Sequence, residues 1–192
     1  LATIPTSCPQ TRAKPHTRVA AGLARCYQIT SIFKRFSVLE NLALAVQARS
    51  GSSFSFWKPV EGETLLFDEA RVIARDVGLA GKTEFLASSL GHGEQRALEV
   101  GLALATRPKL VLLDEPMAGM GPEESNRMIE LIGRIRAQVA VLLVEHDMDA
   151  VFRLADRITV MVTGRVIATG SPEHIRADAE VRRAYLGDEL AA

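Results

Sequence analysis

The chain has 192 residues, 47% of them hydrophobic, which is enough for one ordinary domain with its own core. Acidic and basic residues balance at 23 each, so the net charge gives no argument for binding nucleic acid or an anionic membrane surface. The two cysteines, Cys8 and Cys26, lack the spacing of a metal site, and a reducing cytosol is a simpler expectation than a disulfide framework. No apolar run approaches the ~20 residues that a membrane-spanning helix needs.

The first half of the chain predicts a polar tail followed by two helices. Residues 1–18 contain three prolines and no periodicity, which favours a loop or tail. Residues 37–49 predict a helix, because Ser37 and Glu40 have the spacing of a capping box. Residues 65–79 predict a second helix. Its apolar face is formed by Leu66, Ala70, Ile73 and Val77.

From residue 90 onward the pattern changes to alternating helices and strands. Residues 93–108 are nearly all apolar after their first turn and predict a buried helix. Residues 109–113 form a continuous apolar run typical of an interior parallel strand, and residues 139–146 predict a second buried strand. Between these strands, Pro122 opens a helix with two glutamates in its first turn, where they suit the helix dipole.

The last third of the chain predicts short elements with local signals at their ends. Residues 147–156 predict a short helix with Asp147 as its N-cap. Residues 157–170 predict a hairpin that turns near Thr163-Gly164. Residues 171–187 predict a closing helix or helix pair, capped by Ser171. The succession of strand, helix, strand, helix and hairpin predicts an α/β sheet protein.

Titratable side chains follow both apolar strands directly. Asp114 and Glu115 follow the first strand, and Glu145, His146 and Asp147 follow the second. Ligands of open α/β sheets bind outside the carboxyl ends of the strands. At such a place an Asp suits Mg²⁺, a Glu can orient or deprotonate a water, and a His can hydrogen-bond a phosphoryl group. Taken alone, either set of residues, 114–115 or 145–147, is best explained as a solvated strand end. The presence of both sets in one chain favours a functional site.

A glycine-rich turn and a glutamine extend this pattern. Residues 90–96, LGHGEQR, place a Gly-x-Gly turn before a helix, where free backbone N–H groups form an anion site. Alone this signal is weak, because glycine before a helix is common. Gln28, in CYQIT, carries weight only through its order relative to the other motifs.

The order of these motifs resembles that of the ATP-binding subunits of ABC transporters. The motifs are Gln28 (Q-loop), residues 91–95 (signature), Asp114–Glu115 (Walker B), residues 119–122 (D-loop) and His146 (switch histidine). More narrowly, GLARCYQITSIF, LLVEHDMDAVFRLADRITVM and the terminal AYLG are similar to the ATP-binding subunits of branched-chain amino acid importers. The resemblance covers roughly residues 14–187.

The resemblance implies an ABC ATPase fold of the P-loop NTPase type. In this fold a mostly parallel sheet is flanked by helices, and a helical subdomain carries the signature. The implied partial ATPase domain spans residues 14–187, with the helical subdomain roughly over 37–106. Residues 1–13 would form an irregular tail and 188–192 a C-terminal tail.

The resemblance also implies roles toward ATP and Mg²⁺. Asp114 would coordinate Mg²⁺, Glu115 would be the general base for the hydrolytic water, and His146 would contact the γ-phosphate. Gln28 would touch the metal or the water and report occupancy to the membrane subunits. The nucleotide-binding residues would be Gly91, His92, Gly93, Glu94, Gln95 and Gly121.

The signature residues would close over ATP held by a second subunit, so that two subunits sandwich two ATP molecules head to tail. One feature of the sequence supports this interpretation. A helix start that does not lie beside its own chain's phosphate site needs an external anion.

The chain departs from the family pattern at three places. Gly91 replaces the usual signature serine, which we expect to weaken ATP contact by about 1 kcal/mol, and Gly121 replaces the usual D-loop Asp or Asn. The P-loop pattern G-x-x-x-x-G-K-[ST] is also missing. The sole candidate, DVGLAGKT at 76–83, has Asp76 in place of the first glycine and follows a helix where a strand is needed. We expect the P-loop and the N-terminal strands to be missing, which would leave the sheet with a gap or an unpaired edge.

Three functions are compatible with these observations. The first is an ATP-hydrolysing subunit of an ABC importer for branched-chain or related amino acids, impaired because the P-loop is absent. The second is a non-catalytic subunit that donates only its signature face to an intact ATPase. A DNA-repair type ABC ATPase ranks below both, because no long heptad segment separates the motifs and the neutral charge offers no DNA footprint.

The first function implies several partners. They are a second ATP-binding subunit, membrane permease subunits and, indirectly, a solute-binding protein, with no nucleic acid. The chain would be a cytoplasmic protein held peripherally on the inner face of the plasma membrane.

Overall fold

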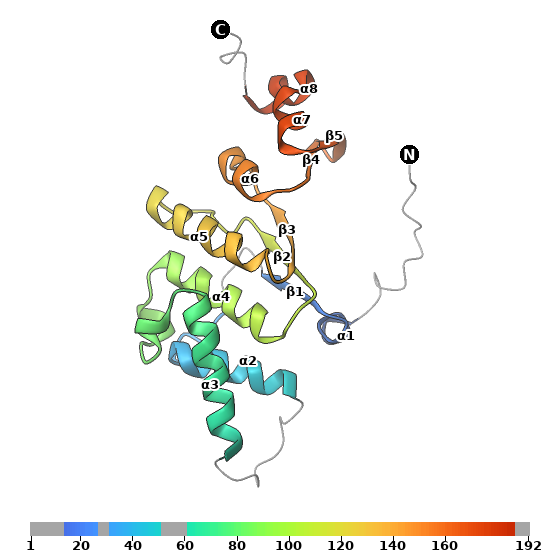
Figure 1. Ribbon diagram of the computed structural model, residues 1–192. Coiled ribbons are helices and arrows are strands. Elements are labelled where there is room, and N and C mark those ends of the chain that lie inside the picture. Colours follow the sequence, from blue (N-terminus) through green and yellow to red (C-terminus); the bar gives the residue numbers. More distant parts are fainter. Residues whose placement is uncertain (1–13, 27–30, 51–60, 187–192) are drawn as a thin grey trace. The chain divides into compact units, whose positions relative to one another are not determined.

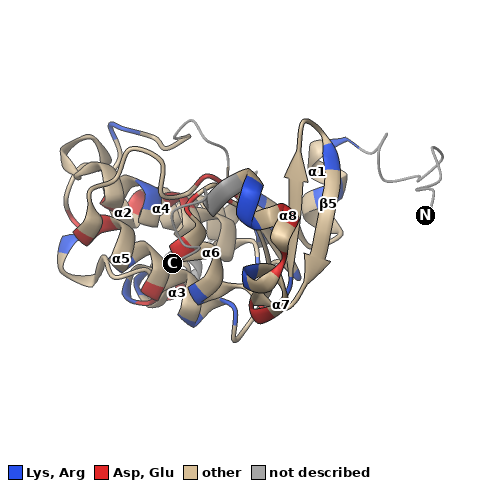
Figure 2. Ribbon diagram, turned by 90° about the horizontal axis from the view of Figure 1, so that it is seen from above, with Lys and Arg blue, Asp and Glu red and all other residues tan. Residues whose placement is uncertain are grey.

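The computed structural model describes residues 14–26, 31–50 and 61–186 (Figure 1). Two compact units make up the chain, Leu1–Val144 and Glu145–Ala192. Basic and acidic residues are interspersed along the helices (Figure 2), in agreement with their equal numbers. None of the described helices is both long and apolar enough to span a membrane.

A three-stranded parallel sheet forms the centre of the first unit. Its order is β1 (Leu23–Cys26), β2 (Leu110–Asp114) and β3 (Ala140–Val144). All neighbours are parallel, and Asp114 at the end of β2 stands opposite Val144. The prediction of an interior parallel strand over 109–113 is therefore confirmed. Parallel neighbours also place the carboxyl ends of the strands at one edge of the sheet.

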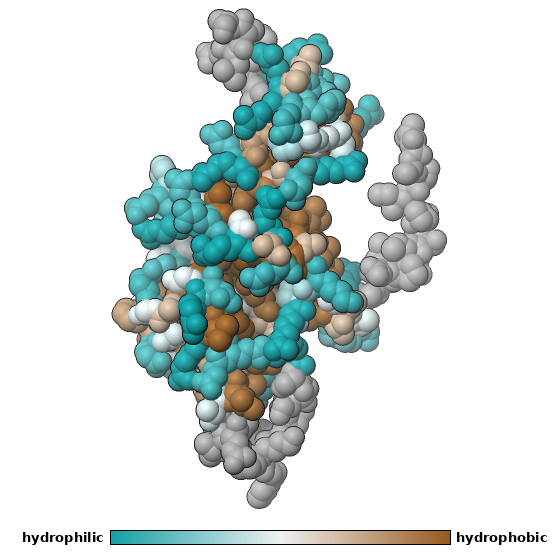
Figure 3. All heavy atoms as spheres, in the orientation of Figure 1, coloured by the Kyte–Doolittle hydropathy of each residue, from teal (hydrophilic) through white to brown (hydrophobic). Residues whose placement is uncertain are grey.

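The strand β3 differs from its prediction. Within the described residues it pairs only with β2, and its side chains Leu142 and Val144 are 50% and 49% exposed. Hydrophobic side chains accordingly reach the surface over the sheet (Figure 3). The prediction of a buried strand over 139–146 is wrong, because an apolar composition suits burial but does not supply the neighbour that covers it. The expectation of a gap or an unpaired edge left by missing N-terminal strands stays a prediction.

The helices of the first unit are α1 (Pro15–Ala20), α2 (Val38–Ser50), α3 (Glu61–Asp76), α4 (His92–Ala105) and α5 (Pro122–Ile135). The capping box of α2 is confirmed: Ser37 N–H donates to Glu40 Oε2 at 2.7 Å, and Glu40 N–H donates to Ser37 Oγ at 3.1 Å. The prediction of a tail over 1–18 is wrong at its end. There Pro15 starts α1, a position where its fixed φ suits a helix.

The helix α4 lies at the core of this unit and packs against α2, α3, α5 and β1. Its residues Leu98 and Val100 are buried, as predicted for 93–108. Gly101 allows the close approach of α2, because a Cβ there would stand 3.0 Å from Leu42 Cδ2. Of the face predicted for residues 65–79, Ala70 and Ile73 of α3 and Val77 just after it are buried, whereas Leu66 is partly exposed. The boundaries of the helical subdomain stay a prediction.

The second unit contains α6 (Met148–Leu154), β4 (Ile158–Val162), β5 (Arg165–Gly170), α7 (Pro172–Ala177), α8 (Ala179–Val181) and a π-helical turn over Arg182–Leu186. Asp147 caps α6 as predicted, accepting from the N–H groups of Asp149 and Ala150. The predicted hairpin is confirmed too, with positive φ angles at Thr163 and Gly164. The hydrophobic core of the second unit is formed by Ile158, Val160, Ala168, Ile175 and Val181.

Candidate functional site

The carboxyl end of β2 presents the two predicted carboxylates. Asp114 is the last residue of the strand, and Glu115 follows with a φ of 47°. A positive φ is uncommon outside glycine and asparagine, and such backbone strain is concentrated at functional sites. The N–H of Glu115 donates to the carbonyl of Val144 at 2.9 Å. The turn that carries Glu115 is therefore anchored to the end of β3.

Asp114 is paired with an arginine that was not predicted. Arg25 Nη2 donates to Asp114 Oδ2 at 2.9 Å, across β1 and β2. The signal that could have revealed this pair is the placement of residues 23–26 as a strand beside β2, since parallel registration brings Arg25 next to Leu112 and near the end of β2. The guanidinium neutralises the carboxylate and occupies one of its oxygens.

Asp114 can still serve as a magnesium ligand. Mg²⁺ in nucleotide sites keeps several waters and uses one or two carboxylates, so it needs no complete protein cage. The described part of the chain offers no group of three or more His, Cys, Asp or Glu residues that could hold a metal ion. The second oxygen of Asp114 is the group that fits such a role.

The positions of Gln28 and His146, the other residues predicted for the hydrolytic site with Glu115, are not described relative to Asp114. Gln28 lies outside the described residues. His146 belongs to the second unit. Its ring is exposed, with Nδ1 3.9 Å from Glu145 Oε2, and its backbone N–H donates to the same oxygen at 3.2 Å. The contribution of Gln28 and His146 to one site with Asp114 stays a prediction.

The signature turn forms the start of α4, with Gly91 as the N-cap. The N–H of Gly91 donates to Glu94 Oε2 at 3.2 Å, and Lys82 Nζ lies 2.5 Å from Glu94 Oε1. Burial opposes ionisation of Glu94, but the hydrogen bonds from Lys82 and Gly91 outweigh it, so the pKa of Glu94 lies below its ordinary value. Glu94 is thus an ionised cap of its own helix.

The remaining signature residues are also held by the chain itself. The N–H of Gly93 donates to Glu124 Oε1 at 3.2 Å, and Gln95 Nε2 donates to the carbonyl of Leu90 at 3.0 Å. His92 is exposed, and its Cε1 lies 3.7 Å from the place that a Cβ of Gly119 would take, beside the D-loop. Glu94 and Glu124 thus accept from the N–H groups of Gly91 and Gly93, and contact of this helix start with an external anion stays a prediction.

Residues 76–83 do not form a phosphate loop. Asp76 ends α3, a short 3₁₀ helix follows over Ala80–Lys82, and Lys82 is bound to Glu94. A P-loop lysine extends from a strand–loop–helix turn toward phosphates. The geometry therefore supports rejecting this segment as a nucleotide site.

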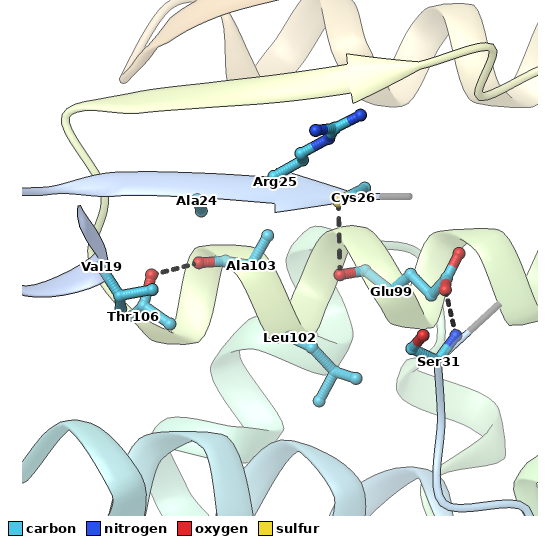
Figure 4. Close-up of a pocket in the computed structure, with 9 residues that line it drawn as sticks. All are labelled: Val19, Ala24, Arg25, Cys26, Ser31, Glu99, Leu102, Ala103 and Thr106. Atoms are coloured by element: carbon cyan, nitrogen blue, oxygen red, sulfur yellow. Dashed lines mark hydrogen bonds between the residues drawn. The ribbon is translucent and has the colours of Figure 1, made fainter. Parts of the chain in front are cut away.

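A cavity of about 200 Å³ lies between β1 and α4, and its residues were not predicted (Figure 4). Within it, Glu99 is buried and accepts from Arg96 Nη1 at 2.9 Å and from Ser31 N–H at 2.5 Å. Glu99 therefore ties the segment that follows the Q-loop position to the signature helix. Burial raises the pKa of Cys26 to about 12, so this thiol stays protonated and is a poor nucleophile.

Four exposed apolar side chains form what we call the aromatic patch: Phe33, Phe36, Phe85 and Leu86. The rings of Phe33 and Phe36 stack with centroids 5.4 Å apart. Backbone bonds join the two segments, from Val38 N–H to Phe85 O and from Ala87 N–H to Phe36 O. Sequence patterns missed this patch, because its two halves lie about fifty residues apart in the chain.

Comparison with known proteins decides the family. The family model described as "ABC transporter" matches residues 5–118, more than half of the chain. The chain belongs to the ABC transporter family. A second model, "Branched-chain amino acid ATP-binding cassette transporter", matches residues 165–191, so the chain is of the branched-chain amino acid type within this family. The first match begins earlier than residue 14, where the motif resemblance starts.

Individual ABC proteins agree with this assignment. The high-affinity branched-chain amino acid transport ATP-binding protein LivG of Escherichia coli (strain K12) is 36% identical over 174 residues, covering 87% of this chain and 68% of LivG. BraF of Pseudomonas aeruginosa, described in the same words, is 34% identical over 180 residues, covering 90% of this chain and 71% of BraF. The ADP conformation of MJ1267, an ATP-binding cassette of an ABC transporter, has a TM-score of 0.72 and 26% identity, covering 92% of this chain and 72% of that chain. The predicted ABC ATPase fold is therefore confirmed.

Proposed function

We propose that this chain is the ATP-binding part of an importer subunit that energises uptake of branched-chain or related amino acids. The observation that carries the proposal is the pair Asp114–Glu115 at the end of the central strand β2, in a chain with a complete signature helix α4. The names of LivG and BraF, which describe branched-chain amino acid transport, support the class of substrate.

The residues at the end of β2 have distinct proposed roles. Bound Mg²⁺ would offset the charge of the nucleotide phosphates, and Asp114 would supply a carboxylate oxygen to it. Arg25 would orient the Asp114 carboxylate through their ion pair. Glu115 would accept a proton from the attacking water, with its backbone held in place by the bond to Val144. Gln28 and His146 would complete the site.

The residues of this chain do not fit the β- and γ-phosphates. The 192 residues contain no G-x-x-x-x-G-K-[ST] pattern, and Lys82, from the sole candidate, pairs with Glu94. We therefore propose that this chain alone binds MgATP weakly. The same observation favours the second function, in which the chain donates its signature face to an intact ATPase subunit.

A MgATP titration of the chain by calorimetry tests the first part of the proposal. We expect weak binding and no turnover above the level of the Glu115→Gln variant, since the phosphate cradle is absent. Tight binding with turnover that Glu115→Gln abolishes would contradict the proposed lack of a phosphate cradle. It would return residues 76–83 to consideration.

Mixing the chain with an intact ATPase subunit of the same family tests the donor function. We expect a heterodimer in the presence of MgATP, and we expect Gly93→Ala in this chain to lower the turnover of the partner. Absence of any heterodimer under these conditions would remove this second function.

For the membrane permease subunits, we propose the aromatic patch as the contact. Half-exposed aromatic side chains beside the basic residues Lys34 and Arg35 are typical of protein interfaces. This contact would hold the chain on the cytoplasmic face of the membrane. We expect Phe33→Ala to reduce co-purification with the permease, while Leu65→Ala, an exposed leucine on α3, has no effect. Equal loss from both variants would contradict the patch as the contact.

A further inference from the structure

One carboxylate joins the first turns of two helices. Glu124 Oε1 accepts from Gly93 N–H of α4 at 3.2 Å, and Glu124 Oε2 accepts from Gly121 N–H before α5 at 3.4 Å. We propose that Glu124 is a positioning residue that couples the signature turn to the D-loop turn, so that the two turns keep one relative position. The naming of these turns rests on the proposed function.

The contact between Glu124 and Gly93 is close along the whole side chain. A Cβ at Gly93 would stand 3.1 Å from Glu124 Oε1 and 3.3 Å from both Glu124 Cβ and Cδ. These separations are tighter than an ordinary side-chain contact, so a larger residue at 93 would push Glu124 away. Gly93 is therefore required by packing between α4 and α5, in addition to any role toward a nucleotide.

Capping of α5 alone does not explain this arrangement. Glycine has no side chain to return a bond, so a cap at Gly121 uses only the bond between its N–H and the carboxylate three residues later. The bond to Gly93 reaches a different helix, 31 residues away in sequence, and satisfies a donor that has no partner within α4. If Glu124 were only a cap, removing its carboxylate would change the amide of Gly121 alone. If Glu124 couples the two turns, its removal changes the amides of both Gly121 and Gly93.

The charges around the bridge are compensated within the chain. Glu94 lies at the same helix start and is bound to Lys82. Arg127, one turn along α5, is hydrogen-bonded to Glu123, and Glu124 and Glu94 contribute further to the raised pKa of its guanidinium. The carboxylates at the start of α4 therefore have basic side chains of the same chain nearby.

Glycine-selective ¹⁵N labelling of the whole chain tests the coupling. The chain has 14 glycines, so the spectrum holds few enough signals to follow Gly93 and Gly121 separately. In Glu124→Ala we expect both signals to shift and the amide exchange of Gly93 to rise about 10-fold, as for the loss of one hydrogen bond. Glu124→Gln, which keeps an acceptor oxygen, should restore part of this protection. The measurement needs no nucleotide, so its outcome is independent of the proposed function.

Glu123→Ala is the matched control. It removes the same charge from the same helical turn, but Glu123 binds Arg127 and not Gly93. We expect the exchange of Gly93 to be unchanged in this variant. The proposal is overturned if Glu124→Ala alters Gly121 but leaves Gly93 as in the wild type. It is also overturned if Gly101, in the middle of α4, gains exchange equally, because that result would reflect general loosening of the helix.

Discussion

The helices α2, α3 and α4 and the edge strand β3 belong to the same unit but differ in how their apolar side chains are covered. Leu98 of α4 is fully buried, whereas Leu142 of β3 is 50% exposed. The signature helix therefore finds its neighbours within the described chain, while the sheet that carries Asp114 and Glu115 has an open apolar edge. A parallel sheet is normally covered on both faces. Within the described residues of the first unit, the apolar side chains of α4 are therefore covered by neighbouring helices, whereas one face of β3 is not.

The strongest contrast is expected between two leucine substitutions. Leu98→Ala should lower the free energy of unfolding by roughly 2–5 kcal/mol, because it opens a cavity in a closed core. Leu142→Ala should cost less than about 1 kcal/mol, because half of that side chain already contacts solvent. Urea unfolding measures both. Similar losses would show that β3 is covered in solution.

The helical part is also held by an ion pair. Arg49 of α2 donates to both oxygens of Glu69 on α3, at 2.7 and 2.8 Å, and to the carbonyl of Ala105 at the end of α4. Arg49→Ala should lower the free energy of unfolding by about 2 kcal/mol, since it removes charge-assisted bonds among three helices. Arg71→Ala, which removes an exposed pair with Asp68, should cost under about 0.5 kcal/mol. Equal costs in urea unfolding would show that the three-helix contact adds nothing.

The same pair predicts a pH dependence. The hydrogen bond from Arg49 holds the pKa of Glu69 below its ordinary value, so ionised Glu69 stabilises the fold near neutral pH. This stabilisation is present above the ordinary Glu pKa of about 4.3 and is lost as the pH falls from there through the lowered pKa of Glu69. The difference in unfolding free energy between wild type and Glu69→Gln should therefore shrink in that range. In an Arg49→Ala background this pH dependence should weaken. If it is unchanged there, a group other than Arg49 lowers the pKa of Glu69.

The smallest effect on stability is expected for a charged substitution on β3, which should instead change self-association. The strand β3 is apolar and carries no charge, and such edges promote pairing between chains. Leu142→Lys should reduce self-association in sedimentation velocity while changing the unfolding free energy little. Leu65→Lys, on the exposed side of α3, is the control and should not reduce it. If both variants reduce association equally, general charge and not the edge is responsible.

Much of the fold was predictable because its signals are local. The capping box of Ser37 and Glu40, the cap at Asp147 and the turn at Thr163-Gly164 each act within a few residues. The apolar run of β2 also predicted its central place. The short elements α1 and β1 were missed, because six and four residues carry too little periodicity to be recognised.

The sequence by itself therefore determined the secondary structure from residue 90 onward and the family to which the chain belongs. Tertiary structure alone decided that Arg25 pairs with Asp114 from 89 residues away, that Glu124 accepts from Gly93, and that β3 pairs with β2 alone among the described strands. The physical reason is that caps and periodicity depend on bonds along one segment, whereas ion pairs, bridging carboxylates and strand coverage depend on which segments meet in space.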